Sequence, residues 1–532
     1  MDVWQQPYNF PSQSWRAMCA AAALLAFAIP SAVSFSMAVV IRNTSRLLRM
    51  PFIWDSDQWA FFCDAAFLVG LLGAARRRWS GHVAVLAASP IVRKMFAILY
   101  FASGFWKINS SFLSPRTSCA SIFTASILGQ IWPHAWGLVP EALARFVVHM
   151  GPAMVIIGEC MAGLLVGAPW RSCRLAGFGL VLLFHAGIAF TPSPNGIANF
   201  SYKAASRYCF LFPEAVSKAF LEAVSLPTSS AGYAGRASAS LVMAVAWHVG
   251  KVAGPQHMGA VFFTSQAVLY ARAAQLEFSR VPTQKAFPLG VAGWWLVIVV
   301  AFLAFGAQIL GLTDLGALAS PFSSIRMQGG SNHLLVPTGL LQAWAGDGSM
   351  PGSSFGGGVV RVEYTDSVWL NSLYPSESTA TLPPEAVAIL HRGGHLGRQF
   401  NPTVRRVVGP GIRAFMPRWK LQDGPFLQYT VPAMELRRLA FEARATGEAF
   451  HLVYTRLPGV AGDEVWRRTA KGLRVEFSLS RNGTEHCIAD GQPCSAEELV
   501  LLPELDWMPK RTRLFFPYPV IAGADNELPC MD

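Results

Sequence analysis

The chain has 532 residues, of which 52% are hydrophobic and only 14% are charged, and its formal net charge is +12. Ordinary soluble domains carry about 25% charged residues, so this composition excludes a wholly water-soluble protein. The Arg and Lys residues stand mostly at the ends of apolar runs, a placement that membrane topology and anionic headgroups explain. We therefore expect membrane lipid, and no nucleic acid, as a partner.

Long apolar runs fill the first part of the chain, and a membrane span needs about 20 apolar residues. The expected spans lie at residues 17–41, 58–75, 83–106, 146–168, 175–191 and 289–311, with one or two more within 237–272. These patterns predict a multi-pass bundle of seven or eight membrane helices over residues 1–312. A β-rich, extracytoplasmic soluble domain is expected to follow over residues 313–532.

Positive charges set the expected orientation of this bundle. With seven spans, the arginines at 76–78 and the pair Arg171 and Arg174 fall on one side, which is then cytoplasmic. The C-terminal domain would lie on the opposite side, for example in the lumen of the endoplasmic reticulum. Arg42, Arg46 and Arg49 also fall on that opposite side and contradict the rule.

Sequons and cysteines bear on the same orientation. The sequons on the expected lumenal side begin at Asn43, Asn109, Asn199 and Asn482. Cys487 and Cys494 bracket a short loop with Gly and Pro that can close a disulfide in an oxidising compartment. The pairing of Cys119 and Cys530 stays open.

The second half of the chain carries strand patterns. Apolar and polar residues alternate over 359–364, 450–457 and 473–480, as in half-buried strands. Residues 434–447 have a helical pattern that ends at Gly447, a plausible C-cap.

One stretch combines an apolar run with a single cation. The run over 82–106 ends in Trp106 and is followed at once by Lys107 and then by Asn109. A lysine in this place either snorkels to the interface or is a partly buried amine that acts as a base. Arg93 and Lys94, earlier in the same run, indicate its cytoplasmic edge and so draw Lys107 toward the interior.

Other ionisable groups lie inside predicted spans, where their cost makes them functional candidates. Glu159 lies within the span at 146–168, and His185 within the span at 175–191. Each also has a purely structural alternative: Glu159 would form an interhelical hydrogen bond, and His185 would be a core histidine whose hydrogen bonds are satisfied. The polar segment 194–208, which includes Asn195 and Tyr202, is predicted to be a broken or re-entrant stretch lining a cavity.

Motifs for metal or nucleotide chemistry are missing from the sequence. There is no CxxC or Cys/His metal spacing, no P-loop and no GxSxG, so no metal is expected.

Several of these residues occur in an order that resembles a known family. Gly104, Lys107 and Asn109 form a Gly-x-x-Lys-x-Asn pattern at the end of an apolar run, and Glu159 and the pair Phe184–His185 follow in later spans. After the last span comes SPFSSIRMQGGSNHLLVP, residues 320–337. The chain thereby resembles the horizontally transferred transmembrane domain family, which includes vitamin K-dependent γ-glutamyl carboxylase.

The resemblance implies a cofactor and site residues. It implies reduced vitamin K or a related quinol, whose oxygenation drives carboxylation of a lumenal protein substrate, with Lys107 as the base and His185 as its catalytic partner. The residues that we assign to quinol binding are Trp106, Asn109, Glu159, Asn195 and Tyr202. The alternative is a non-catalytic member of the family that handles lipid or binds a partner through its soluble domain.

Overall fold

The protein is described from a computed structural model, which covers most of the helical region and part of the remainder. The described residues are 12–29, 31–49, 55–76, 81–115, 118–131, 141–191, 198–223, 231–253, 255–279, 290–306, 323, 325, 333–336, 359–366, 377–381, 403–407, 429–432, 436, 444, 447–456, 472–494 and 520–521.

The chain divides into two compact units. Unit 1 comprises Met1–Arg49, Ile53–Gly104 and Val155–Phe302, and unit 2 comprises Met50–Phe52, Phe105–Met154 and Leu303–Asp532. The predicted boundary between residues 312 and 313 lies outside the described residues.

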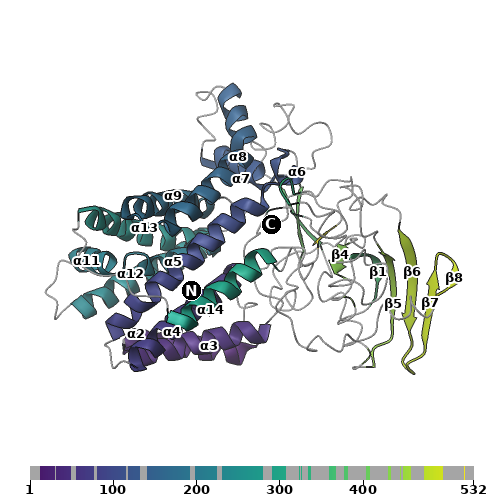
Figure 1. The fold of residues 1–532 in the computed structure, drawn as a ribbon, viewed down its shortest axis with the longest axis horizontal. Coiled ribbons are helices and arrows are strands. Elements are labelled where there is room, and N and C mark those ends of the chain that lie inside the picture. The colour runs from purple at the N-terminus through teal and green to yellow at the C-terminus, as the bar shows by residue number, and fades with distance from the viewer. Residues whose placement is uncertain are drawn as a thin grey trace. The chain divides into compact units, whose positions relative to one another are not determined.

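The described part of unit 1 is helical (Figure 1). Its helices are α2 (Gln13–Ala28), α3 (Ala32–Arg49), α4 (Asp55–Arg76), α5 (Gly81–Trp106), α8 (Glu141–Gly167), α9 (Arg171–Ala189), α10 (Ala198–Ala205), α11 (Pro213–Ala223), α12 (Ala231–Ala253), α13 (Pro255–Ser279) and α14 (Gly290–Ala301). The last two residues of α5 and the first half of α8 belong to unit 2.

Four of the described helices are long and apolar enough to cross a membrane. They are Ser56–Arg76 in α4, Val85–Trp106 in α5, Ala142–Gly167 in α8 and Arg171–Ala189 in α9. These four agree with the spans predicted at 58–75, 83–106, 146–168 and 175–191. The predicted total of seven or eight spans is not confirmed, since the remaining apolar helices are shorter or less apolar.

The other predicted spans differ from the observed helices. The run at 17–41 is not one helix but two, because α2 ends at Ala28 and α3 begins at Ala32, on either side of Pro30. Proline lacks the N–H that a continuing helix needs, which accounts for the break. The described residues of 237–272 lie in two helices, α12 and α13. In the run predicted at 289–311, the described residues 290–306 form α14 and a π-helical turn over Phe302–Gly306.

Helix α5 continues through Arg93 and Lys94 without a break. The prediction that these residues mark the cytoplasmic edge of the span concerns the membrane and not the helix, so it stays a prediction. Two glycines bring α5 and α8 close together. A Cβ on Gly163 would lie 2.5 Å from the backbone nitrogen of Phe101, and one on Gly104 would lie 2.7 Å from Cys160 Sγ. Small residues permit this kind of close helix approach.

Unit 2 combines short helices with an antiparallel sheet (Figure 1). Helices α6 (Ser110–Leu113) and α7 (Cys119–Ile131) follow α5 in the chain. The strands are β1 (Val359–Thr365), β2 (Glu377–Thr381), β3 (Thr403–Val407), β4 (Tyr429–Pro432), β5 (Phe450–Arg456), β6 (Leu473–Leu479), β7 (Glu485–Ala489), β8 (Gln492–Pro493) and β9 (Val520–Ile521). Strands β1, β5 and β6 confirm the three predicted from alternation.

The described strands form one sheet of seven strands in the order β8-β7-β6-β5-β1-β4-β9, and β2 pairs with β3 separately. Alternate residues on β5 and β6 face a common apolar core, to which Leu452, Tyr454, Val475 and Phe477 contribute. The helix predicted over 434–447 lies mostly outside the described residues. Gly447 has a φ of +69° and its N–H donates to the Arg444 carbonyl, as expected of a C-terminal glycine.

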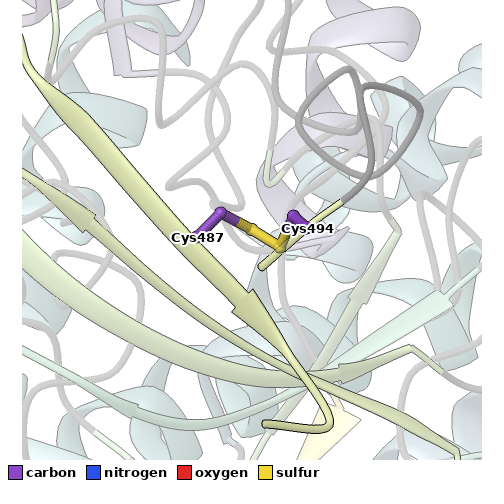
Figure 2. The surroundings of a disulfide bond; sticks show 2 residues. All are labelled: Cys487 and Cys494. Carbon is purple, nitrogen blue, oxygen red and sulfur yellow. A yellow bond between two sulfur atoms is a disulfide. The ribbon is translucent and has the colours of Figure 1, made fainter. Parts of the chain in front are cut away.

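Disulfides lie in unit 2. Cys487 on β7 bonds to Cys494 just after β8, with Cα atoms 5.3 Å apart (Figure 2). This is the pair that the loop spacing predicts. Cys119 is also disulfide-bonded, and its partner, like Cys530, lies outside the described residues.

Candidate functional site

Lys107 directly follows α5 and belongs to unit 2. The residue is only 4% exposed, although its side chain carries an amine. The Nζ atom lies 5.8 Å from the centre of the Phe112 ring, within the range of a cation–π interaction. Lys107 is therefore an enclosed residue and not a lysine that extends into water.

Asn109 fixes the turn that carries Lys107. It is the N-cap of α6, and its Oδ1 accepts from the Phe112 backbone N–H at 2.8 Å. Its Nδ2 donates to the carbonyls of Trp106, at 2.7 Å, and Ser323, at 2.8 Å. Asn109 is fully buried, and both amide hydrogens already have acceptors.

His333 ties a later segment to the same turn. It forms an isolated antiparallel bridge with Asn109, and the Leu334 N–H donates to the Ile108 carbonyl at 3.0 Å. Nε2 of His333 lies 2.9 Å from the Phe105 carbonyl, which can only accept, so Nε2 carries the proton. Nδ1 accepts from the backbone N–H groups of Leu335 and Val336, each at 3.1 Å.

These contacts explain the protonation behaviour of His333. Burial lowers the pKa of the imidazole below its ordinary value, and the hydrogen bond to Phe105 opposes this only partly. A proton on Nδ1 would also displace the two backbone donors. His333 is therefore held neutral.

Trp106 completes the support of this turn. Its indole nitrogen donates to the Ala304 carbonyl at 2.7 Å. Ala304 lies in the π-helical turn that follows α14, where the regular helical hydrogen-bond ladder is interrupted. The motif around Lys107 and the segment with His333, far apart in sequence, therefore form one hydrogen-bonded assembly.

His185 is the second predicted catalytic residue, and it belongs to unit 1. It is fully buried on α9, and its Nε2 lies 2.7 Å from the Tyr100 hydroxyl. The Tyr100 hydroxyl lies 3.3 Å from that of Tyr208, and His185 Nδ1 lies 3.2 Å from Ser201 Oγ. The four side chains form a closed, buried polar chain.

The direction of each hydrogen bond in this chain can be deduced. Ser201 donates its one hydroxyl proton to the His185 carbonyl at 3.0 Å, so its oxygen must accept from Nδ1. Nδ1 then carries the ring proton, and the neutral ring accepts at Nε2. Tyr100 therefore donates to His185, and Tyr208 donates to Tyr100.

The remaining predicted quinol-binding residues divide by position. Glu159 is buried on α8. Tyr202 is buried on α10, beside Ser201. Asn195 lies outside the described residues. The two predicted catalytic residues belong to different units, so each stands here with its own surroundings.

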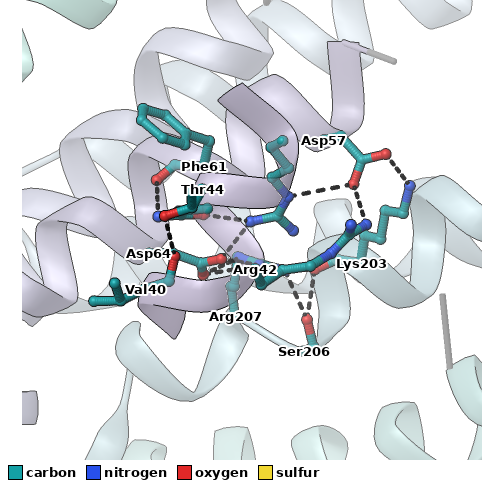
Figure 3. A network of polar contacts seen from close by, with 11 residues as sticks. Val40, Arg42, Thr44, Asp57, Phe61, Asp64, Lys203, Ser206 and Arg207 are labelled. Atoms are coloured by element: carbon teal, nitrogen blue, oxygen red, sulfur yellow. Dashed lines mark hydrogen bonds and ion pairs between the residues drawn. The ribbon is translucent and has the colours of Figure 1, made fainter. Parts of the chain in front are cut away.

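A network of ion pairs in unit 1 is the feature that sequence reasoning missed (Figure 3). Asp57 and Asp64 on α4 are its carboxylates. Asp57 pairs with Lys203 Nζ at 3.0 Å and with Arg42 at 3.5 Å. Asp64 pairs with Arg46 at 2.6 Å and receives a two-pronged contact from Arg207 at 2.8 and 2.9 Å.

This network explains two puzzles of the sequence. The positive-inside rule applies to charged residues in loops. Arg42 and Arg46 instead lie on helix α3, where they pair with acidic residues of α4, so they do not count against the predicted orientation. The polar segment after residue 194 contains the short helix α10, whose Lys203 is 3% exposed. A signal was present, since Asp64 stands in the span predicted at 58–75 and Asp57 directly before it, and two residues seven positions apart share a helix face.

A smaller polar cluster lies on the sheet. Glu363 falls where the pairing of β1 with β5 shifts register, a bulge that redirects side chains. Its carboxylate accepts from Arg361 at 3.1 Å and from the Thr455 hydroxyl, and lies 3.6 Å from Arg474. The Arg474 side chain is 55% exposed, so the cluster reaches the surface of the unit.

Among the described residues, no group of three or more His, Cys, Asp or Glu side chains is placed to hold a metal ion. The comparisons with known proteins concern mainly the sheet. Residues 331–511 match a family described as a domain of unknown function (DUF8388). No curated protein and no solved structure matches the chain.

Proposed function

We propose that the chain is an integral membrane protein of the horizontally transferred transmembrane domain type, in which the sheet-bearing part of unit 2, residues 313–532, lies on the extracytoplasmic side, for example in the lumen of the endoplasmic reticulum. Four apolar helices of spanning length support the membrane part of this proposal. The Cys487–Cys494 disulfide supports an oxidising compartment for unit 2. The free cysteines found among the described residues, Cys19, Cys63, Cys160, Cys173 and Cys209, all belong to unit 1.

Within this protein, Lys107 acts as a base toward a small apolar substrate of the reduced-quinone class. The burial of Lys107 is the observation that carries the proposal. Removing an ammonium ion from water costs several kcal/mol even after relaxation, so an enclosed lysine beside a membrane helix has a role in function by default. When the amine is charged, the cation–π interaction with the Phe112 ring offsets about 0.5–2 kcal/mol of this desolvation cost.

The aromatic residues near Lys107 suit a quinol ring, but the polar groups of Trp106 and Asn109 are not free to bind its hydroxyls. The Phe112 ring faces Lys107 Nζ, and the rings of Phe105 and Trp106, which directly precede Lys107, pack against each other, so aromatic rings of the kind that a quinone stacks on are present in this turn. The Trp106 N–H and the Asn109 amide already donate to backbone carbonyls, so quinol binding by either would require these bonds to be exchanged. Their more direct contribution is to hold the turn that carries Lys107.

A bound reduced quinone would supply reducing electrons and an acidic hydroxyl. In the proposal, Nζ of Lys107 takes up the hydroxyl proton, and the Phe112 ring stabilises the ammonium that results. The burial of Lys107 limits the access of water to the amine. Carboxylation of a lumenal protein substrate is the reaction that this deprotonation would serve.

The test uses the full chain in microsomes, with reduced vitamin K as the probe. Epoxide formation and fixation of CO₂ into a glutamate-containing peptide are measured for the unchanged protein and for Lys107→Ala and Lys107→Arg. Lys218→Ala is the matched control, since the Lys218 side chain is 66% exposed on α11. We expect both Lys107 variants to lose turnover and Lys218→Ala to keep it. Equal turnover by all variants, or none by the unchanged protein, would reject the enzymatic role.

The second candidate is a non-catalytic membrane protein whose sheet binds a partner. The match to a domain of unknown function favours it, because residues 331–511 include β1 to β8 and none of unit 1's helices. The partly exposed cluster around Glu363 and Arg474 gives this sheet a charged surface. A protein inactive in the microsomal assay, with a partner captured only when Arg474 is intact, would support this candidate.

A further inference from the structure

The sequons of the chain differ sharply in their accessibility. Asn109 is fully buried, and its Nδ2 donates to two backbone carbonyls. Asn43 is 7% exposed, and its Nδ2 donates to the Phe61 carbonyl at 3.3 Å. The nitrogen that a glycan would need is thus engaged inside the protein at both positions. Asn199 lies in α10, and its side chain is outside the described residues.

Asn482 is placed in the opposite way. It stands in the turn that joins β6 to β7, and Asn482, Gly483 and Thr484 are all exposed. The φ of Gly483 is +82°, a conformation that glycine adopts without a steric penalty. The sequon therefore lies at the tip of a hairpin, where an enzyme can reach it.

The side chain of Asn482 is also held in a defined orientation. Its Oδ1 accepts from the Thr484 backbone N–H at 3.1 Å, which forms an Asx turn, and from the Ser480 hydroxyl. Because Oδ1 faces these donors, Nδ2 is directed away from them. No hydrogen bond from Nδ2 to a described residue is present.

We infer that Asn482 is an N-glycosylation site, modified with an oligosaccharide from a lipid-linked diphosphate donor. In this transfer, C1 of the first sugar bonds to Nδ2 of Asn482. The bond from C1 to the diphosphate oxygen breaks, the lipid diphosphate leaves with that electron pair, and Nδ2 loses one proton. Of the four sequons, Asn43 and Asn109 remain unmodified in the folded protein.

This inference rests on the proposed extracytoplasmic position of unit 2, and the Cys487–Cys494 bond tests that position separately. The full chain is expressed in eukaryotic secretory cells and treated with peptide N-glycosidase, which converts a glycosylated Asn to Asp. Peptide mass spectrometry then identifies the modified residue. The variants are Asn482→Gln and Thr484→Ala, with Thr484→Ser as the control that preserves the sequon. Thiol labelling without reductant reports whether Cys487 and Cys494 are bonded.

We expect one glycan at Asn482, its loss in Asn482→Gln and Thr484→Ala, and its retention in Thr484→Ser. An unmodified Asn482 with Cys487 and Cys494 bonded would overturn the inference and leave the position of unit 2 intact. An unmodified Asn482 with both thiols free would overturn the inference and the proposed position together. A glycan at Asn109 in the folded protein would contradict the conclusion that burial protects Asn109 and exposure favours Asn482.

Discussion

The Tyr100 hydroxyl donates to Nε2 of His185 across 2.7 Å, although the two residues are 85 positions apart in the chain. The bond joins α5 to α9 and is buried on both sides. It fixes the ring of a histidine that sequence patterns single out as functional. In a low-dielectric interior such a bond is strong, and the loss of one partner is costly.

Tyr100→Phe removes both a donor and an acceptor from this chain. His185 Nε2 then loses its partner inside the protein, and the Tyr208 hydroxyl loses the oxygen to which it donates. A buried polar atom without a partner costs about 1–3 kcal/mol, so we expect a fall of that size in the free energy of unfolding. Thermal unfolding of the purified protein in detergent measures it.

Tyr208→Phe is the internal control for the deduced direction of the bonds. Tyr208 is the terminal donor, so its loss leaves His185 fully hydrogen-bonded, and we expect a smaller destabilisation than for Tyr100→Phe. An effect of Tyr208→Phe equal to or larger than that of Tyr100→Phe would contradict the central place of Tyr100 in this chain of hydrogen bonds.

Asp57 and Lys203 provide a second prediction, based on a buried ion pair. Both side chains are 3% exposed, and Asp57 also faces Arg42 and Arg46. Removing one partner of a buried pair commonly costs about 3–5 kcal/mol, because the other charge is left in a low dielectric. We expect Asp57→Asn to destabilise more than Lys203→Met, since Asp57 loses three cationic partners and Lys203 only one carboxylate.

A double-mutant cycle makes this quantitative. The double variant Asp57→Asn with Lys203→Met should be less destabilised than the sum of the single variants, by about 0.5–3 kcal/mol. Lys218→Met is the control, since its pair with Glu222 is exposed and 4.0 Å long, and it should change stability by less than about 1 kcal/mol. If the losses of stability in the two single variants add up to the loss in the double variant, the ion pair between Asp57 and Lys203 contributes nothing to the free energy of unfolding.

Much of the fold was accessible from periodicity alone. Strands β1, β5 and β6 follow from their alternating residues, and four long helices follow from uninterrupted apolar runs. Pro30 indicates a helix break, but because the residues on both sides of it are apolar, the run at 17–41 was predicted as one span. The apolar stretches of α12 and α14 are shorter than those of the four long helices, so the spans predicted there stay predictions.

The candidate sites were only partly accessible. The burial of Lys107 is what a base in this place requires, and its catalytic role stays a prediction. His185 is buried with both ring nitrogens hydrogen-bonded, which agrees with the satisfied core histidine that the sequence also allowed. Asn109 and Trp106 were expected to contact substrate, but their hydrogen bonds run to Ser323 and Ala304, about two hundred positions away. Contacts over such separations depend on tertiary packing, which local patterns do not encode.

Gly163 allows a third prediction, which concerns helix packing. A Cβ at this position would lie 2.5 Å from the Phe101 nitrogen, so α5 and α8 would have to move apart. We expect Gly163→Ala to destabilise the protein by about 1–3 kcal/mol, as is typical of overpacking. Thermal unfolding in detergent gives the value.

Gly158 is a matched control on the same helix, because nothing lies within 4 Å of a Cβ placed there. Alanine is a better helix former than glycine by about 1 kcal/mol, so Gly158→Ala should leave stability unchanged or raise it. Equal losses in Gly158→Ala and Gly163→Ala would mean that the close approach of α5 and α8 is not what glycine provides.

His333 gives the last prediction, a dependence of stability on pH. Its pKa in the folded protein is lowered from about 6.5, chiefly by burial, so the unfolded chain binds the proton more readily. The contribution of His333 to stability is therefore complete above the unfolded pKa and falls as the pH drops below it. His333→Asn keeps an oxygen that accepts from Leu335 and Val336 but removes the titrating ring, so its melting temperature should vary less between about pH 5 and pH 8. The exposed His486 on β7 supplies the control, and His486→Asn should retain the full dependence. An unchanged pH profile in His333→Asn would mean that the buried imidazole is not the group that the acid titrates.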